Sequence, residues 1–280
     1  MTIPRSHPRY ESLVRRERLV RAWKQGVVVP EGLIAQGRGE AWDYLFGEET
    51  SAPALVAERA AAAHLLAANR PVISVNGNVA ALAAREVVQL ARAIPARIEV
   101  NLFHRTEPRV KKIVRILERA GARNVLGLRP NARIPGIESK RALSHRDGIF
   151  GADVVLVPLE DGDRAEALVR MGKTVISVDL NPLSRTSQRA TIPIVDELTR
   201  AILNVKKFVE ELKANQEEAA RVRRAYRRNG NLAAVYSFLE WRLGQLRRGL
   251  VRGEKRSGAK KRNARPIGRP DVTASDRTST

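Results

Sequence analysis

Short apolar runs alternate with helix-forming stretches from Pro71 to about residue 200, and this alternation constrains the fold more than any other feature. The two clearest runs, 153–157 and 174–178, are rich in Val, Ile and Leu. Strands that are buried on both faces have this composition, and parallel strands need a helical crossover between them. The sequence therefore predicts an α/β fold, in which a Rossmann-like, mostly parallel sheet is covered by helices on both faces.

The same pattern places the other elements. Further strands are expected at 72–75, 98–103, 124–128 and 191–195, with helices at 79–93, 107–120, 163–171 and from 196. Segment 129–148 is rich in Pro, Gly and charge and is expected to be a long loop, which is uncommon without a function. N-terminal helices are expected at 9–25, through Trp42 and Leu45, and from a Ser51 cap to about residue 68.

The expected domain organisation is one α/β domain over 1–250, followed by a disordered basic tail at 251–280. Within the domain we expect an N-terminal helical part at 1–68, the Rossmann-like core at 69–200 and a C-terminal helical extension at 201–250. The tail holds 9 Lys/Arg, 3 Asp/Glu and no aromatic residue. Such a segment buries too little apolar surface to offset its ordering entropy, hence the expected disorder.

Charge and cysteine content restrict the function classes. The net charge is +21, of which +12 falls in the last 80 residues, so the body is only moderately basic. A moderately basic body is consistent with phosphorylated small molecules as ligands. The chain has no Cys, which excludes disulfides and thiol catalysis. No apolar run approaches the roughly 18–20 residues of a membrane span, and no signal segment is recognisable, so a cytoplasmic protein is expected.

Polar clusters follow four of the expected strands: Asn76–Asn78, Asn101–Thr106, Glu160–Arg164 and Asp179–Thr186. Asn, Asp and Gly also punctuate ordinary turns, so one such cluster would carry little weight. All strands of a parallel sheet end on the same side, and ligands of open α/β sheets bind there. Four clusters at one edge therefore predict the position of a binding site.

Two of these clusters carry most of the charge. Glu160, Asp161 and Asp163 could hold Mg²⁺ or orient an amine, although Asp163 could instead only cap the next helix. Arg164 could pair with a phosphate. Asp179 stands at the end of a strand, and in nucleotide-binding sites a carboxylate at this position hydrogen-bonds the ribose hydroxyls. Arg185 and Thr186 offer donors to a phosphate, the alternative for Arg185 being a solvated surface arginine.

A glycine-rich segment, Gly37-Arg38-Gly39, precedes the expected short helix near Trp42. Backbone N–H groups at a helix N-terminus can cradle a phosphate. The segment matches neither the P-loop pattern nor the dinucleotide-binding glycine pattern, so it is a weak signal by itself. The four histidines lack the spacing of metal ligands.

Several stretches together resemble one family, archaeal phosphopantothenate synthetase (4-phosphopantoate–β-alanine ligase). They are Ile3–Tyr10, Gly32-Leu-Ile-Ala-Gln-Gly-Arg-Gly-Glu-Ala41, Pro71–Leu82, Ile149-Phe-Gly-Ala-Asp-Val-Val-Leu-Val-Pro-Leu-Glu-Asp-Gly-Asp-Arg164 and Val178-Asp-Leu-Asn-Pro-Leu-Ser-Arg-Thr186. The resemblance covers about residues 3–245. It implies a homodimer that uses ATP and Mg²⁺ to join 4-phosphopantoate to β-alanine, releasing AMP and pyrophosphate, on the route to coenzyme A.

The resemblance also implies site residues. Matched motif by motif, the family's ATP contacts fall on Arg16, Arg38, Asp179, Leu180, Asn181, Arg185, Thr186, Glu197 and Leu198. For 4-phosphopantoate we expect Asn76, Asn78 and Arg105, because they share the sheet edge. Arg38 and Arg185 are the expected catalytic cations, and Asp161 or Asp163 is expected to meet the ammonium of β-alanine or the Mg²⁺. The metal ligands stay open.

The chemistry agrees with this site composition. A carboxylate becomes a good acylating agent when attack on the ATP α-phosphate converts it to an acyl-adenylate, and the amine then displaces AMP. Such catalysis needs cations and positioning rather than a nucleophilic side chain. Two alternatives remain: a nucleic-acid-binding protein that uses its basic C-terminal third, and a nonenzymatic nucleotide sensor.

Overall fold

The computed structural model describes residues 3–262. The chain divides into two compact units, one ending at Leu239 and one beginning at Glu240, and helix α10 (Arg228–Arg262) contains the boundary. The expected single domain over 1–250 stays a prediction.

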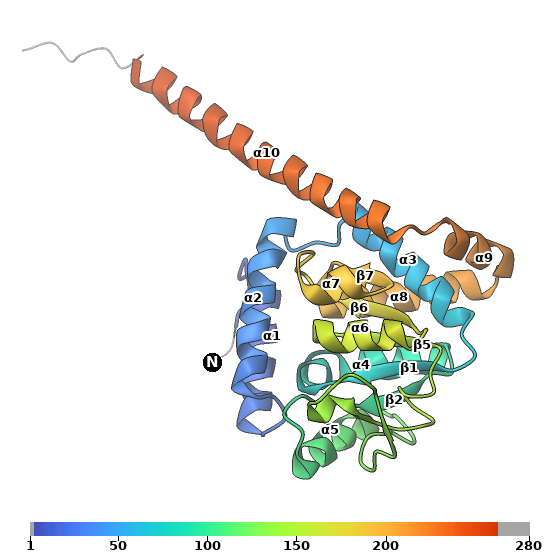
Figure 1. Ribbon diagram of the computed structural model, residues 1–280. Coiled ribbons are helices and arrows are strands. Elements are labelled where there is room, and N and C mark those ends of the chain that lie inside the picture. Colours follow the sequence, from blue (N-terminus) through green and yellow to red (C-terminus); the bar gives the residue numbers. More distant parts are fainter. Residues whose placement is uncertain (1–2, 263–280) are drawn as a thin grey trace, which may run out of the picture. The chain divides into compact units, whose positions relative to one another are not determined.

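The central sheet has five parallel strands in the order β2-β1-β5-β6-β7 (Figure 1). Register is continuous across the middle, where Val155 pairs with both Val72 and Val175. The strands are β1 (Pro71–Val75), β2 (Arg97–Val100), β5 (Val154–Pro158), β6 (Thr174–Val178) and β7 (Ile192–Ile194). This confirms the expected parallel α/β sheet. The order reverses between β1 and β5, and in doubly wound sheets the ligand crevice lies at such a reversal.

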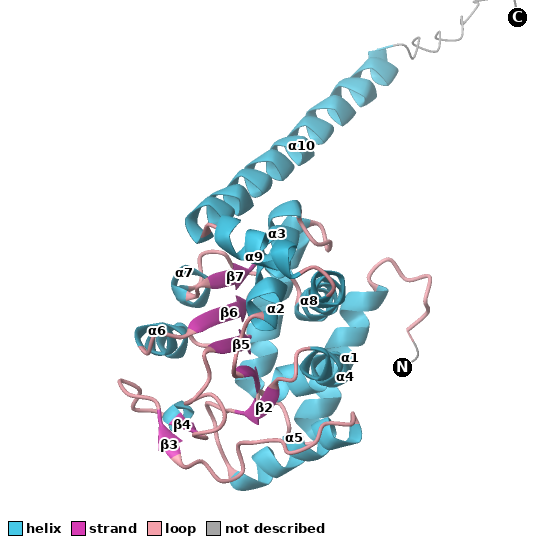
Figure 2. Cartoon of the chain, turned by 90° about the vertical axis from the view of Figure 1, so that its right-hand side faces the viewer, coloured by secondary structure: helices cyan, strands magenta, loops and turns pink. Residues whose placement is uncertain are grey.

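Alternate residues of the three central strands, β1, β5 and β6, enter two different cores. Ile73 and Leu156 pack in the larger cluster with α3 (Ala52–Leu66), α4 (Gly77–Ala93) and α8 (Leu198–Lys213). Val72 and Val155 face the opposite side, where α6 (Gly162–Arg170) packs. Figure 2 shows α6 and α7 (Arg185–Arg189) on one face and α3, α4 and α8 on the other. Helices therefore cover both faces, as the apolar strands require.

The N-terminal helices are α1 (Tyr10–Lys24) and α2 (Pro30–Phe46). The prediction for the glycine-rich segment was wrong, because Gly37-Arg38-Gly39 lies inside α2 rather than before a helix. Pro30 opens the helix at its first turn, a position that suits proline. Each interior glycine costs about 1 kcal/mol of helix propensity, a cost that tertiary packing can offset. The segment therefore presents no helix N-terminus to a phosphate.

Segment 97–148 differs most from expectation. The predicted strand at 124–128 makes only a single parallel bridge, between Glu99 and Leu126. Gly127, at φ +114°, lies so close to the Val100 backbone that a side chain would collide with its carbonyl oxygen. Helix α5 (Glu107–Arg119) follows β2 as predicted. The expected loop contains a short antiparallel pair, β3 (Ala132–Arg133) and β4 (Leu143–Ser144), joined through a 3₁₀ turn at Lys140–Ala142.

The C-terminal helices are α8, α9 (Gln216–Ala225) and α10. Helix α10 continues through 251–262, so the backbone there is helical rather than disordered as predicted. Its Arg, Lys, Glu and Ala residues favour helix, and extending an existing helix is easier than nucleating one. The rest of the predicted tail, 263–280, lies outside the described residues. Over the described part of the chain, no helix has the length and apolarity that a membrane span needs.

Candidate active site

A cavity of about 670 Å³ lies at the carboxyl edge of the sheet. Residues that follow all five strands line it, and helix α2 forms a further wall that includes Glu31, Gly32 and Arg38. The strand-end residues are Asn76–Asn78 after β1, Leu102–His104 after β2, Leu159–Asp161 after β5, Asp179–Asn181 after β6 and Asp196–Leu198 after β7. The polar strand ends therefore meet around one space, as the parallel topology predicts.

The β5 end is built around Glu160, which is buried between two arginines, Arg141 and Arg164. The guanidinium groups of both arginines contact the Glu160 carboxylate directly. Burial would raise the pKa of Glu160, but Arg141 and Arg164 outweigh it and hold the pKa below its usual value. Ser74 on β1 accepts a further hydrogen bond from Arg164 at 3.3 Å. Glu160 is thus an ionised anchor rather than a free ligand for a metal or an amine.

The two aspartates beside it occupy different places. Asp161 lines the cavity, is half exposed, and lies 2.8 Å from Nε of Arg141. Burial raises its pKa. Asp163 is 70% exposed, pairs with Arg185 and is not among the lining residues. The residue at the N-cap position of α6 is Asp161, and its side chain makes no capping hydrogen bond. Asp163 sits in the first turn.

The β6 end is open. Asp179 accepts a hydrogen bond from the Asn181 N–H at 2.9 Å, and burial raises its pKa while Ser184, Asn181 and Arg38 oppose that effect. Arg38 reaches this region from α2 and makes no hydrogen bond or ion pair with any other described residue. A carboxylate and an unpaired guanidinium that line one cavity suit a ligand that offers both hydroxyls and phosphates.

Arg185 and Thr186 lie at the start of α7 and join the β5 and β6 ends. Arg185 pairs with Asp163 and, at 2.8 Å, with Glu166 on α6. The buried Thr186 hydroxyl donates to the Glu160 carbonyl at 2.7 Å. Neither residue is among those that line the cavity.

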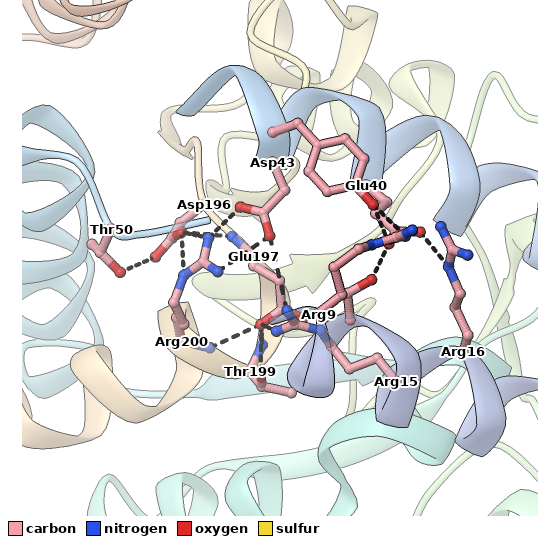
Figure 3. Close-up of polar contacts among 12 residues, drawn as sticks. Arg9, Arg15, Arg16, Glu40, Asp43, Thr50, Asp196, Glu197, Thr199 and Arg200 are labelled. Carbon is pink, nitrogen blue, oxygen red and sulfur yellow. Dashed lines mark hydrogen bonds and ion pairs between the residues drawn. The ribbon is translucent and has the colours of Figure 1, made fainter. Parts of the chain in front are cut away.

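The β7 end carries an ionic network that ties α1, α2 and α8 together (Figure 3). Glu197 caps α8 by accepting from the Thr199 N–H at 2.9 Å and pairs with Arg15 at 3.1 Å. Arg200 bridges Asp43 at 2.6 Å and Asp196 at 2.7 Å. Oε2 of Glu197 makes both the capping hydrogen bond and the ion pair with Arg15, and both Glu197 and Leu198 line the cavity.

Arg16 lies at the far end of the same view and is held by Glu40, with Nε to carboxylate oxygen at 2.7 Å (Figure 3). Burial opposes ionisation of Glu40, but hydrogen bonds from Arg16, Ser12 and Tyr44 hold its pKa at about 2. Arg16 is 47% exposed and is not among the lining residues. The strong pair fixes α1 against α2.

Comparison with known proteins decides the family. The family model described as phosphopantothenate/pantothenate synthetase matches residues 53–242. The chain belongs to this family. A 4-phosphopantoate–β-alanine ligase of Methanosarcina mazei is 59% identical over 77% of the chain and 85% of its own length. Ligases of the same name from Methanospirillum hungatei (54%; 86% of the chain, 98% of the relative) and Thermococcus kodakarensis (49%; 88% and 95%) are also similar.

The residues expected to bind 4-phosphopantoate all make hydrogen bonds within the protein. Asn76 caps α4 by accepting from the Val79 N–H at 3.1 Å and donates to the Leu159 carbonyl at 2.9 Å, which ties β1 to β5. Asn78 donates to the Gly32 carbonyl at 2.8 Å and so holds α2. Both asparagines line the cavity, but Arg105 does not. Arg105 donates to the Gly127 carbonyl instead.

Sequence reasoning missed two cavity cations, Arg109 and Arg141. Arg109 lies in the first turn of α5, where it resembles any helical surface arginine. Arg141 lies in segment 129–148, and the only signal was the unusual length of that loop. Both residues reach the cavity through tertiary packing that no local pattern specifies.

Proposed function

We propose that the chain condenses 4-phosphopantoate with β-alanine, using ATP and releasing AMP and pyrophosphate, to give 4′-phosphopantothenate for coenzyme A biosynthesis. The observation that carries this assignment is identity of 49–59% to relatives named 4-phosphopantoate–β-alanine ligase, over 77–88% of the chain. The cavity at the sheet edge is the proposed reaction site.

The proposed mechanism passes through an acyl-adenylate. The carboxylate of 4-phosphopantoate attacks the α-phosphate of ATP and displaces pyrophosphate, and the β-alanine amine then attacks the acyl carbon and displaces AMP. Both steps move negative charge onto phosphate oxygens, so preorganised cations lower the barrier more than a nucleophile would. Arg38 is the proposed catalytic cation, because its guanidinium has no protein partner among the described residues.

We assign ATP to the β6–β7 half of the cavity. Asp179, Leu180 and Asn181 follow β6, and Glu197 and Leu198 open α8; all five line the cavity. Leu180 is buried and fixes the loop, while Asp179 offers its carboxylate to ribose hydroxyls.

Arg16, Arg185 and Thr186 remain proposed ATP contacts with a condition attached. Each already has a protein partner. Arg16 pairs with Glu40, Arg185 pairs with Asp163 and Glu166, and the Thr186 hydroxyl donates to the Glu160 carbonyl. They would meet ATP only by exchanging these partners for phosphate oxygens.

For the other substrates, Asn76, Asn78 and Arg105 remain the proposed residues for 4-phosphopantoate, and Asp161 or Asp163 for the ammonium of β-alanine. Asp161 has the stronger support, because it lines the cavity and Asp163 does not. An ammonium there would share Asp161 with Arg141.

Mg²⁺ is a further part of the proposal. Among the residues whose side chains the structure describes, 3–250, no group of three or more His, Cys, Asp or Glu is placed to hold a metal. Mg²⁺ in nucleotide sites is commonly held by one or two carboxylates together with phosphates and water. Asp161 and Asp179 line the cavity and fit that limited role. The ion would neutralise charge on the triphosphate when bound.

A homodimer, a cytoplasmic location and weak binding of polyanions by the basic tail stay predictions.

The direct test is AMP formation by the purified full chain with ATP, 4-phosphopantoate and β-alanine. We expect AMP only when all three are present, and no AMP when pantoate replaces 4-phosphopantoate. AMP formation with pantoate would indicate a pantoate ligase. ATP binding without turnover on either acid would favour the nucleotide sensor, and salt-dependent binding to duplex nucleic acid without turnover would favour the nucleic-acid-binding alternative.

A further inference from the structure

The cavity holds its cations in two separate places. Arg38 acts on Asp179 at the β6 end. Arg109 and Arg141 lie around the ends of β2, β1 and β5, since their partners are the His104 carbonyl after β2 and the carboxylates of Glu160 and Asp161 after β5. With neighbouring strands about 4.8 Å apart, β2 and β6 are about 14 Å apart in the sheet. The two cationic regions can therefore serve different anionic groups.

Arg109 is fixed by backbone oxygens alone. Its Nε donates to the Val27 carbonyl at 2.8 Å and its Nη1 to the His104 carbonyl at 2.9 Å. Its Nη2 donates to no group in the described part of the chain, and it lies 2.8 Å from where a Cβ on Gly77 would stand. Only glycine at position 77 permits this approach. The guanidinium is thus oriented without being neutralised.

Arg141 is only 7% exposed, and it shares the Glu160 carboxylate with Arg164. Glu160 is already matched by Arg164, which is itself 1% exposed. Around this end, the three arginines 109, 141 and 164 face Glu160 and Asp161, while Glu31 acts on Arg109 and Glu99 acts on Arg164. Burial and then the charge of Arg141 lower the pKa of Arg109, with Glu31 opposing them. Two guanidinium groups therefore repel each other at the cavity wall, an arrangement that a bound anion would relieve.

We propose that Arg109 and Arg141 form the subsite for the phosphomonoester of the acid substrate, and so select 4-phosphopantoate over free pantoate. The inference rests on the proposed function. Guanidinium groups bind phosphate through paired, charge-assisted hydrogen bonds, and a dianion matches two fixed cations. A phosphate held at the β2–β1–β5 side leaves the carboxylate end of the substrate free to point toward Asp179 and Arg38, where ATP is proposed to bind.

The experiment compares Arg109→Gln with Arg115→Gln in the full chain. Arg109 is the primary target because it contacts carbonyls rather than the Glu160 network. Arg115 is a matched control, since it is exposed on the same helix and lines no part of the cavity. We expect Arg109→Gln to raise the KM for 4-phosphopantoate about 10- to 100-fold, leaving the KM values of ATP and β-alanine within about twofold. The preference for 4-phosphopantoate over pantoate should fall by the same factor.

Arg141→Lys and Arg141→Gln give the second measurement. Lysine keeps the charge but loses the paired geometry, so we expect it to weaken 4-phosphopantoate binding less than glutamine does. A rise in the KM for ATP with unchanged KM for 4-phosphopantoate would overturn the subsite and place the triphosphate there. Unchanged constants for both substrates would reduce the two arginines to structural roles.

Calorimetric titration with 4-phosphopantoate in the absence of ATP separates this proposal from the ligase assignment. Normal turnover by the unaltered chain together with unchanged 4-phosphopantoate binding by Arg109→Gln would reject the subsite and keep the function. Binding that depends on Arg109, in a chain that forms no AMP, would support the subsite and reject the function.

Discussion

The carboxyl ends of β5 and β6 are neighbours in the sheet, but they hold their charges differently. At the β5 end, Glu160 is buried between Arg141 and Arg164, and each charge has a partner. At the β6 end, Asp179 faces Arg38, which has no ion-pair partner among residues 3–250, whose side chains the structure describes. A buried carboxylate that is paired on both sides fixes geometry, whereas unpaired groups at a cavity remain available to a ligand. Two similar clusters in the sequence thus have different duties.

The largest expected effect comes from removing one of the two ion-pair partners of Glu160 at the β5 end. Arg164→Met should lower the free energy of unfolding by about 3 kcal/mol, because it removes one of the two partners of a fully buried carboxylate. Urea denaturation measures the loss. The double variant with Glu160→Gln should lose less than the sum of the two single variants. A single-variant loss near zero would show that Glu160 does not need Arg164 to stay ionised.

At the β6 end, we expect substitution to change ATP affinity rather than the stability of the fold. Arg38→Ala should weaken ATP about 10- to 100-fold by calorimetry, because it removes a charge-assisted contact to phosphate. Its denaturation midpoint should stay unchanged, since the guanidinium makes no hydrogen bond or ion pair with another described residue. The exposed Arg119, at the end of α5, offers a control through Arg119→Ala. Unchanged ATP affinity in Arg38→Ala would remove the catalytic role from Arg38.

A third arrangement appears at the β7 end, where Glu58 on α3 is fully buried beside Asp196. Burial and then the charge of Asp196 raise the pKa of Glu58 to about 9, against Asn204 and Arg200. The unfolded chain loses this proton above about pH 4.5 and the folded chain keeps it to about pH 9, so stability falls as the pH rises through that window.

Glu58→Gln should flatten this pH dependence, which is on the order of 1 kcal/mol per pH unit. Urea denaturation of both proteins at several pH values from about 5 to about 9 measures the slopes. A variant with the same slope as the parent would show that Glu58 is already ionised in the folded chain.

The smallest expected effect belongs to Arg185. Its partners Asp163 and Glu166 lie at the surface, and exposed ion pairs contribute little, so Arg185→Ala should not measurably change the denaturation midpoint. ATP affinity should fall less than about fivefold, because a contact to phosphate would have to replace existing ion pairs. A loss as large as that of Arg38→Ala would show that Arg185 does exchange its carboxylates for ATP, and that the β6 end extends to α7.

The sequence by itself determined the sheet and the edge at which the cavity, the candidate site, lies. Apolar runs such as 153–157 and 174–178 are local signals, and the parallel topology they imply brings their polar ends to one edge. Family membership likewise came from contiguous motifs, which 49–59% identity to the named ligases supports.

Only the tertiary structure decided which charges are paired. Glu160 and Asp179 look alike as acids that follow strands, but Glu160 is neutralised by Arg141, which arrives from a loop 19 residues away. Likewise, Glu197 meets Arg15 of α1, and Gly37-Arg38-Gly39 lies inside a helix that packing stabilises. Hydrophobic periodicity acts over a few residues, whereas the partner of a charge depends on which distant elements pack beside it. The physical reason is that electrostatic pairing is set by distance in space, and distance in the chain does not report it.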